Sequence, residues 1–371
     1  MSETAKNESG PGGLSTSATS SSPSVAVTVL NWNAWSEVLT CAESVLASTY
    51  PSRQLILVDN GSTDESPDRL KAWAAHRFVM WEQDEGEFAG ARFLVWKRPP
   101  RGATDLPGLE TVALLFSKEN TGYTGGVNLG IKWGLERDVP VEFICWAGAD
   151  VRFLPTTLSS LVDAARASGA GLVGGTDLDP ESGRVERICE PPYPVALAYF
   201  IGYLPGVRGL VSRLYARRSR RDASLPQGVR RSGRAWGAVL LACREMLEGV
   251  RARRGTYLND GFFMYGDESD ISWACREVGW QVAATDHAVF HHPLGVPKPP
   301  RVYYYSTRNA LLLAHQIMPW YLRWPFYAVH GGSTLISAAR QLLRGKVQVA
   351  KARWAGLKDG HRKVTGRWIE H

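Results

Sequence analysis

Four apolar runs in the first 150 residues constrain the fold more than any other feature of the chain. Each contains consecutive apolar residues, which is typical of a strand buried on both faces of a sheet. The stretches from Trp35 to Ser48, from about Pro67 and from Gly125 to Glu136 have helical spacing and lie between or after these runs. The alternation predicts an α/β fold with a mostly parallel sheet flanked by helices. The four runs are Val25–Asn33, Gln54–Ser66, Thr111–Glu119 and Val141–Asp150.

The rest of the chain is less regular. Asp84–Gly108 interrupts the alternation and is interpreted as an inserted loop or hairpin, and Arg234–Val250 as a strand running into a helix. Gly261–Trp280 is expected to be a loop entering a helix, and Val282–His292 a strand. We expect a disordered, Ser/Gly-rich tail over residues 1–24 and one domain over residues 25–300, with its halves meeting at residue 152. A basic, aromatic helical extension is expected over residues 301–371.

Cysteine usage and hydropathy bear on where such a chain works. The five cysteines are scattered, and none of them forms a CxxC pair. This argues against a disulfide framework or a zinc site and favours a reducing compartment, so a cytoplasmic location is expected. The stretch before Val25 lacks the apolar core of a signal peptide. The most apolar segment, Ala310–Leu335, is interrupted by polar residues and prolines, so no transmembrane helix is expected.

The net charge of +7 is concentrated in parts of the chain. Between Arg301 and His371, twelve Lys and Arg residues face only Asp359 and Glu370, and a second basic cluster spans Arg208–Arg234. Such clusters attract phosphate-bearing partners, among them anionic lipid. In the first cluster Trp320, Trp324, Phe326 and Tyr327 suggest an interfacial segment that contacts the inner face of a membrane. The alternative is a helical cap with a solvated basic surface.

Polar residues stand where the predicted strands end. In parallel sheets ligands bind beyond the carboxyl ends of the strands, and Asn31, Asp59, Asn120 and Asp150 fall there. In VDNGSTD (Val58–Asp64) a carboxylate can accept hydrogen bonds from a base or a ribose, although such residues are also common helix caps. Asp150 is a plausible ligand for Mg²⁺ or Mn²⁺ on a diphosphate, although a lone Asp is more often a turn residue.

A glycine-rich stretch, NTGYTGGVNLG, opens the third predicted helix. Gly122, Gly125 and Gly126 would let the backbone approach an anionic ligand at the helix start. The stretch is neither a GxGxxG dinucleotide motif nor a Walker loop, which argues against those two classes. The alternative is a helix that uses glycine to pack closely on the sheet.

Two further groups carry potential chemistry. Asp267, Glu268 and Asp270 follow the aromatic stretch FFMY, where a carboxylate could serve as a general base, or could simply favour the first turn of a helix. His291 and His292 end an apolar strand, and imidazole suits Mn²⁺, although a lone His is more often structural.

The order of these motifs resembles the family-2 glycosyltransferases with the GT-A fold, and within them the rhamnosyltransferase-like subgroup. The resemblance covers roughly Val25 to Asn309. It rests on the motifs VTVLNWN, VDNGSTDES, NTGYTGGVNLG, GAVLLACRE and DGFFMYGDESD, followed by CREVGW and AVFHH.

The resemblance implies an inverting enzyme that moves a sugar, rhamnose among the candidates, from a nucleotide-diphosphate donor to a glycan or lipid-linked acceptor in cell-surface polysaccharide synthesis. A divalent metal, Mn²⁺ or Mg²⁺, would be its cofactor, and no nucleic-acid partner is implied. Donor-binding residues would be Asn31, Asp59, Asn120, Gly122, Gly125, Gly126 and Arg308. Glu268 would be the base with Asp267 as its competitor, Asp150 with His291 or His292 would bind the metal, and Trp236, Gly237 and Tyr265 would contact the acceptor.

Two positions depart from the family pattern. The metal motif of the family is often DxD or NxD, but Gly148 occupies its first position here. The two acids before the helix have the order Asp267-Glu268, the reverse of the usual one. These departures favour, as an alternative, a non-catalytic relative that binds glycan or lipid. A nucleotidyltransferase ranks last, because its Gly-rich, Arg- and Lys-bearing signature is absent.

Overall fold

The computed structural model describes residues 22–99, 106–137, 141–186, 210, 224–235, 238–294 and 297–368. In the first half the elements are β1 (Val25–Asn31), α1 (Trp35–Leu46), β2 (Arg53–Asp59), α2 (Ser66–Arg77), β3 (Glu82–Phe88), β4 (Ala91–Lys97), β5 (Leu109–Phe116), α3 (Gly122–Glu136), β6 (Phe143–Gly148) and β7 (Arg152–Phe153). In the second half they are α4 (Thr157–Ser168), β8 (Ala170–Leu178), β9 (Val185–Glu186), β10 (Val229–Arg231), β11 (Val239–Cys243), α7 (Arg244–Arg254), η1 (Asp260–Phe262), α8 (Asp267–Glu277), β12 (Gln281–His291), α9 (Pro300–Ile317), α10 (Trp320–Leu343) and α11 (Val347–His361).

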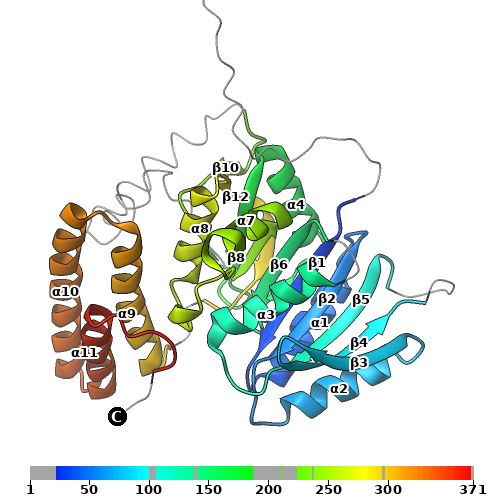
Figure 1. The fold of residues 1–371 in the computed structure, drawn as a ribbon, viewed down its shortest axis with the longest axis horizontal. Helices are drawn as coiled ribbons and strands as arrows, with labels where there is room; N and C mark the ends of the chain where they lie inside the picture. Colours follow the sequence, from blue (N-terminus) through cyan, green and yellow to red (C-terminus); the bar gives the residue numbers. More distant parts are fainter. Residues whose placement is uncertain are drawn as a thin grey trace, which may run out of the picture.

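One sheet runs through the molecule in the order β10-β12-β8-β11-β6-β1-β2-β5-β4-β3 (Figure 1). The centre, β6-β1-β2-β5, is parallel, and β8 and β12 form a second parallel pair. Strand β11 is antiparallel to both β6 and β8, so β8 and β12 still run in the direction of β1. The carboxyl ends of six strands therefore lie along one edge of the sheet, where ligand sites form in such folds.

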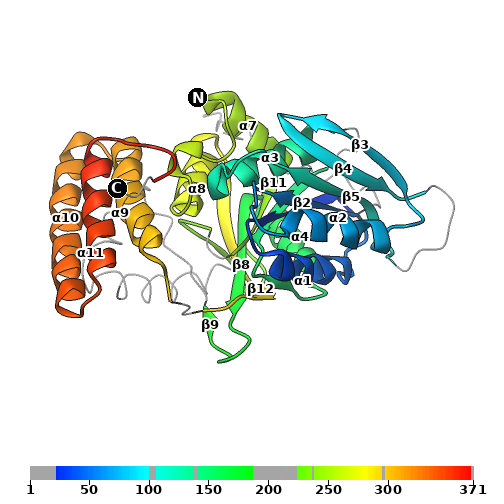
Figure 2. The same cartoon turned by 90° about the horizontal axis from the view of Figure 1, so that it is seen from below.

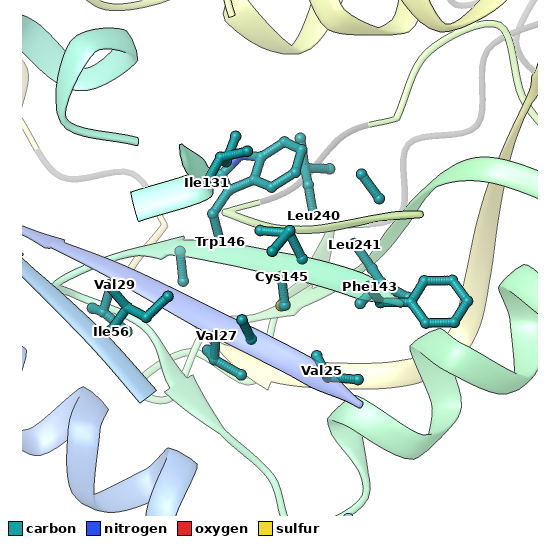
Figure 3. Packing of buried hydrophobic residues seen from close by; sticks show 14 of the residues in the cluster. Val25, Val27, Val29, Ile56, Ile131, Phe143, Cys145, Trp146, Leu240 and Leu241 are labelled. Carbon is teal, nitrogen blue, oxygen red and sulfur yellow. The ribbon is translucent and has the colours of Figure 1, made fainter. Parts of the chain in front are cut away.

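Helices cover both faces of this sheet. Helices α1, α2 and α4 pack on one face, and α3, α7 and α8 pack on the other (Figure 2). The main core lies between these layers, and its central strands are buried along their whole length. Figure 3 shows Val27 and Val29 of β1, Cys145 and Trp146 of β6 and Leu241 of β11 packed within it. The continuous apolar runs seen in the sequence follow from this burial on both sides.

The last three helices form a separate layer at one end of the molecule (Figures 1 and 2). Helix α11 packs closely against α9 and also contacts α10. Small apolar clusters of their own hold these helices together, one around Leu311 and Phe326 and another around Tyr304 and Tyr305. Both views place α10 farthest from the sheet. Among the helices of the described ranges, none is long and apolar enough to cross a membrane.

The predicted fold class is confirmed, because the chain forms a mixed α/β structure whose principal strands share one direction and are flanked by helices. Asp84–Gly108, interpreted as a loop or hairpin, includes most of the antiparallel hairpin of β3 and β4 at one edge of the sheet, while residues 100–105 lie outside the described ranges. Helix α4 and strand β8, which lie in the less regular second half, were not predicted from the sequence. The expected tail lies almost wholly outside the described residues, and the domain boundaries at residues 152 and 300 stay predictions.

Candidate active site

A cavity of ≈ 710 Å³ opens beside the carboxyl ends of β1 and β6. This volume suits a ligand the size of a nucleotide or nucleotide-sugar. Strand ends, the start of α3, the FFMY loop, the start of α9 and the C-terminal tail all contribute to its wall. Its lining residues are Leu30, Trp32, Ala34, Glu37, Asn60, Asn120, Gly122, Tyr123, Gly148, Ala149, Asp150, Phe263, Met264, Pro299, Pro300, Arg301, Tyr305, Arg367 and Trp368.

Asn31 and Asp59 are paired residues at the ends of β1 and β2, but they do not line this cavity. Both are buried, and Asn31 Nδ2 donates a hydrogen bond of 2.8 Å to Asp59 Oδ1. Ser62 Oγ donates to the same oxygen at 2.5 Å, which closes the acidic turn on itself. The cavity is lined instead by their chain neighbours Trp32 and Asn60. The pair therefore joins the ends of β1 and β2 next to the residues that line the cavity.

The turn after β2 and the start of α3 are joined by asparagine side chains. Asn60 Nδ2 donates to Gly122 O at 2.8 Å, and Asn60 Oδ1 accepts from the Thr121 N–H at 3.1 Å. Asn120 Oδ1 accepts from the Gly122 N–H at 2.8 Å. Gly122 has a φ of +81°, and a Cβ there would lie 2.4 Å from Phe263 O. Glycine is therefore required at the point where α3 meets the FFMY loop.

The other glycines of α3 serve packing. A Cβ on Gly126 would lie 2.3 Å from Leu30 Cδ1, and one on Gly130 would lie 2.2 Å from Thr28 Cγ2. Gly125 faces its own N-cap residue, Thr121, rather than the cavity. Close packing of helix on sheet, the alternative weighed from the sequence, thus accounts for Gly125 and Gly126, while Gly122 lines the cavity.

Asp150 and His292 come together at the edge of the cavity. His292 Nε2 lies 3.7 Å from Asp150 Oδ2, and the Asp150 side chain is 56% exposed. On its other side, His292 Nδ1 lies 3.1 Å from Asp177 Oδ2. Asp177 is buried, and within the described ranges its Oδ1 has no hydrogen-bond partner. A carboxylate that orients an imidazole in this way is a common arrangement behind metal-binding histidines.

Asp177 was not anticipated, although the sequence held a signal for it. It stands near the end of β8, paired with Phe290 of β12. The stretch AGLVGGTDL is an apolar run that reaches its Asp at the strand end, as VDNGSTD and WAGAD do. His291, by contrast, makes no contact with Asp150 among the described interactions, so the structure singles out His292 of the two.

The chain that follows His292 is held by Asp179. Its Oδ2 accepts from the Leu294 N–H at 2.6 Å, and its Oδ1 accepts from the Ser182 N–H at 2.7 Å. These backbone hydrogen bonds lower the pKa of Asp179 to about 2. The aspartate therefore stays ionised and keeps the segment after β12 in place.

Gly148 occupies the position two residues before Asp150. A Cβ there would lie 2.9 Å from Asp150 Oδ1, because the carboxylate folds back over the glycine. Within the described ranges no group of three or more His, Cys, Asp or Glu side chains is arranged to hold a metal ion. Asp150 and His292 alone would be a two-ligand set, which leaves a bound cation dependent on oxygens of its ligand and of water.

Asp267 and Glu268 open α8, next to the FFMY loop. Burial, followed by the charges of Glu268 and Asp270, raises the pKa of Asp267 well above its usual range. Burial also raises the pKa of Glu268, but Arg234 and Lys298 act in the opposite direction. Of the two acids, Glu268 is less buried and has cations nearby, so it is the one better held as a carboxylate.

The charges of these acids and of Asp150 act on the pKa values of two tyrosines. Burial raises the pKa of Tyr123 well above its usual range, and the charges of Asp267, Glu268 and Asp150 add to the effect. For Tyr265, burial is again the main cause, with contributions from Glu268, Asp150 and Asp267. The three carboxylates therefore act on the same two phenols, and Tyr123 itself lines the cavity.

Asp270 has a different role. It is fully buried and accepts two hydrogen bonds from Arg254, at 3.0 and 2.8 Å. This ion pair joins α8 to α7, so the third acid of the triplet is structural.

The FFMY loop is held in a strained form. Phe263 and Tyr265 have φ values of 63° and 64°, a region that residues other than glycine rarely adopt. Asn309 Nδ2 donates to the carbonyl oxygens of Phe262, Met264 and Tyr265 at 3.0, 2.8 and 2.7 Å. Asn309 therefore fixes the loop that ends at Gly266, from which α8 with Asp267 and Glu268 begins.

Arg308 does not reach the cavity, which corrects the expectation that it meets the diphosphate. It is fully buried, and its guanidinium donates to the carbonyls of Gly261, Phe262 and Gly366. Its neighbour Asn309 accepts from Arg308 Nε at 2.9 Å. The Arg-Asn pair thus binds the loop to α9 and to the C-terminal tail.

The predicted acceptor residues are only partly visible. Trp236 and Gly237 lie outside the described residues. Tyr265 lies beside the cavity without lining it, with Lys298 Nζ 5.8 Å from the centre of its ring. Of the site residues expected from the sequence, Asn120, Gly122 and Asp150 line the cavity directly, with Asp267, Glu268 and His292 close to it.

Comparison with known proteins bears on the first part of the chain. Residues 24–97 match the model of Glycosyl transferase family 2. This match covers the strand ends of β1 and β2 and the acidic turn between β2 and α2. No curated protein matches the sequence.

Among solved structures the fold is similar to the mannosyltransferase PcManGT from Pyrobaculum calidifontis, in complex with GDP-Man and Mn²⁺. The TM-score is 0.48 at 14% identity, over 92% of this chain and 88% of the other. It is also similar to S. aureus TarS, with a TM-score of 0.47 at 9% identity over 82% of this chain, which spans only 42% of TarS. Residues 1–349 of TarS give a TM-score of 0.46 at 10% identity, with 92% of both chains covered.

Proposed function

We propose that the protein is a GT-A glycosyltransferase that moves a sugar from a nucleotide-diphosphate donor with inversion at the anomeric carbon. The observation that carries the proposal is a cavity at the carboxyl edge of the sheet, lined by Asp150 and by the loop that leads into Asp267 and Glu268 of α8. The family match over residues 24–97 supports it from the sequence side.

The donor would lie along the cavity with its nucleoside toward the end of β1. Trp32 and Asn60 line that part, while Asn31 and Asp59 hold the strands beneath them. The diphosphate would then meet Asn120 and Gly122 at the start of α3, where the helix dipole favours an anion.

A divalent cation, Mn²⁺ or Mg²⁺, fits between the donor and this chain. Asp150 and His292 would hold it, since a carboxylate and an imidazole suit Mn²⁺ and the buried Asp177 carboxylate orients the imidazole. When bound, such a cation offsets the charge of a departing diphosphate.

Glu268 would take the proton of the acceptor hydroxyl as that oxygen attacks the anomeric carbon. Arg234 and Lys298 favour its ionised form, whereas Asp267 has two acids beside it that favour protonation. Two neighbouring carboxyl groups in different surroundings commonly divide the acid and base roles. Asp267 would then act by shaping the acceptor site.

The acceptor would be a glycan or a lipid-linked intermediate of cell-surface polysaccharide synthesis, and rhamnose would be among the candidate sugars. The outer face of α10 supports an acceptor that is associated with a membrane. The outer face of α10 exposes the apolar residues Trp320, Tyr321, Trp324, Leu335, Ile336, Leu342 and Leu343. Phe326, expected among them, is buried against His330 instead.

Charge around this α10 face fits anionic lipid. Helices α9 and α10 contain no Asp or Glu, and Arg323, Arg340, Arg344 and Lys346 lie along or just after α10. Aromatic and aliphatic side chains flanked by cations are typical of helices that lie in a membrane interface. Two copies of so basic a face would repel each other, which favours lipid over a second copy of the chain.

The experiment is a thermal-shift screen of nucleotide-sugars, with and without Mn²⁺, followed by chromatography of the nucleoside diphosphate released. A true donor and the metal should raise the melting temperature together. A ligand present at a hundred times its Kd adds about 2.7 kcal/mol to the free energy of unfolding. If no nucleoside diphosphate or nucleotide-sugar shifts the melting temperature, the proposal is wrong.

A further inference from the structure

The cavity carries two cations that no motif pointed to. Arg301 at the start of α9 and Arg367 in the C-terminal tail both line it, together with the acids Glu37 and Asp150. Among the ion pairs of the described residues, neither arginine is joined to a carboxylate. Both are close to Tyr305, whose pKa is raised by burial while the two guanidinium charges act in the opposite direction.

The backbone on both sides of Arg367 is fixed. The Gly366 N–H donates to Gly261 O at 2.9 Å, and Gly366 O accepts from Arg308 Nη1 at 2.7 Å. The Trp368 N–H donates to Tyr305 Oη at 2.8 Å. The Trp368 ring stacks on Tyr304 with ring centres 4.6 Å apart and planes at 10°. The tail therefore forms an ordered part of the cavity wall, and Arg367 lies between Gly366 and Trp368, whose backbones are both hydrogen-bonded.

Arg301 is held by a contact with a residue from the N-terminal part of the chain. Its guanidinium lies 5.5 Å from the centre of the Trp32 ring, a cation–π contact with the residue that follows β1. The Trp32 ring is 38% exposed, so it offers its surface to the cavity. The end of the nucleotide-binding strand and the start of the helical extension thus meet at this arginine.

We propose that the tail segment Val364–Trp368 completes the donor site, and that Arg367 and Arg301 contact the diphosphate of the nucleotide-sugar. This inference rests on the proposed function and adds the residues that would recognise the anionic part of the donor. Arginine forks match phosphate oxygens with two parallel hydrogen bonds. Arg308 acts as a positioning residue, since it holds Gly366 next to Arg367.

A diphosphate could also belong to a lipid-linked acceptor. The donor is the better match, because Asn120, Gly122 and Asp150 line the same cavity as the two arginines. The test must separate these two sources of the same chemical group.

The test is calorimetric titration of the full chain with three probes, which are the nucleoside diphosphate found in the donor screen, the corresponding nucleoside and a short-chain prenyl diphosphate. Arg367→Ala and Arg301→Ala should each weaken binding of the nucleoside diphosphate by about tenfold or more. Affinity for the nucleoside should stay the same. Arg367→Lys should recover part of the loss, since it keeps the charge without the fork.

Arg362→Ala is the matched control, because Arg362 is exposed on the same tail and does not line the cavity. Melting temperatures of the free variants should match the wild type. Wild-type affinity of Arg367→Ala for the nucleoside diphosphate would overturn the inference, and so would a loss confined to the prenyl diphosphate. If the wild-type chain binds no nucleoside diphosphate, the proposed function itself fails, before any variant is compared.

Discussion

The Nε2 atom of His292 lies 3.7 Å from Oδ2 of Asp150. This distance is too long for a hydrogen bond, so the two groups face each other without being joined. The imidazole is oriented from behind by Asp177, whose Oδ2 is 3.1 Å from Nδ1. An exposed carboxylate and an oriented imidazole at the cavity edge form the part of the site where a metal would act.

The first prediction concerns this pair. His292→Ala and Asp150→Asn should each abolish the additional melting-temperature shift that Mn²⁺ produces with a nucleoside diphosphate. Asp177→Asn should weaken Mn²⁺ binding by about 10- to 100-fold, because the imidazole loses its orienting carboxylate. Thermal shift over a Mn²⁺ titration measures both effects.

His291→Ala is the control for the metal site, since His291 makes no described contact with Asp150. Its Mn²⁺ response should equal that of the wild type. A variant lacking His292 that still responds to Mn²⁺ as the wild type does would remove the imidazole from the proposed site.

The second prediction separates the two acids of α8. Glu268→Gln should lower the rate of sugar transfer by about 10²- to 10⁴-fold with little change in donor affinity, because it removes the base and keeps the shape. Asp267→Asn should cost less in rate. Turnover assays with donor titrations distinguish the two, and a larger rate loss for Asp267→Asn would reverse the assignment.

The Glu268→Gln variant also decides between the enzyme and a non-catalytic relative. If the chain binds glycan or lipid without catalysis, wild type and variant should both lack transfer and donor hydrolysis. Equal binding of the acceptor by the two would then be expected.

The third prediction is a shift in pH dependence. Burial raises the pKa of Glu268, and Arg234 counteracts this. The base works only when ionised, so the rate should fall as the pH drops through this raised pKa. Arg234→Gln removes the counteracting charge, raises the pKa further and should move the acidic limb of the rate profile to higher pH.

A pH series of turnover for both proteins measures that shift. Arg230→Gln is a useful comparison, because Arg230 pairs with Asp286 at 2.7 Å and is not among the charges that act on Glu268. An acidic limb that stays in place in Arg234→Gln would contradict the environment described for Glu268.

The fourth prediction concerns stability. Asp270 is fully buried and Arg254 is 16% exposed, so removing either partner leaves a buried charge or an unpaired guanidinium. Asp270→Asn should reduce the free energy of unfolding by about 3–5 kcal/mol. Denaturant titration measures the loss, and the surface pair of Arg69 with Glu65 is a control expected to contribute less than about 1 kcal/mol.

The fifth prediction concerns the outer face of α10. Trp324→Ser combined with Leu335→Ser should weaken binding to vesicles containing phosphatidylglycerol several-fold, because it removes exposed apolar area while keeping every charge. Sedimentation with vesicles of graded anionic content measures the change.

Met80→Ser is the control, since Met80 is 83% exposed and follows α2, which lies at the opposite end of the molecule from α10 (Figure 1). If the wild-type chain fails to sediment with anionic vesicles, the lipid assignment is wrong. Dimerisation that the α10 variant abolishes would assign the face to a second copy of the chain.

The mostly parallel sheet and its ligand edge follow from short-range patterns. Continuous, largely β-branched runs such as Val25–Asn31 are typical of strands buried on both faces, and the helices between them favour parallel neighbours. The position of Asp150 at a strand end was therefore readable from the sequence. The sequence also pointed to Gly122, which lines the cavity. Gly126, expected beside it, packs against Leu30 instead.

The roles of neighbouring residues needed the tertiary structure. His291 and His292 are adjacent in the sequence, but only His292 faces Asp150. Arg308 carries a charge that suggests a phosphate, yet it is buried among backbone carbonyls.

The sequence by itself determined the α/β class, the edge of the sheet that holds the site and the acids that could act there. Only the tertiary structure brought Asp177, Arg301 and Arg367 to that edge, from β8, α9 and the C-terminal tail. The physical reason is distance along the chain. Periodicity reports which face of one element is buried, whereas contacts between Trp32 and Arg301, or between Arg308 and Gly366, depend on how whole layers pack.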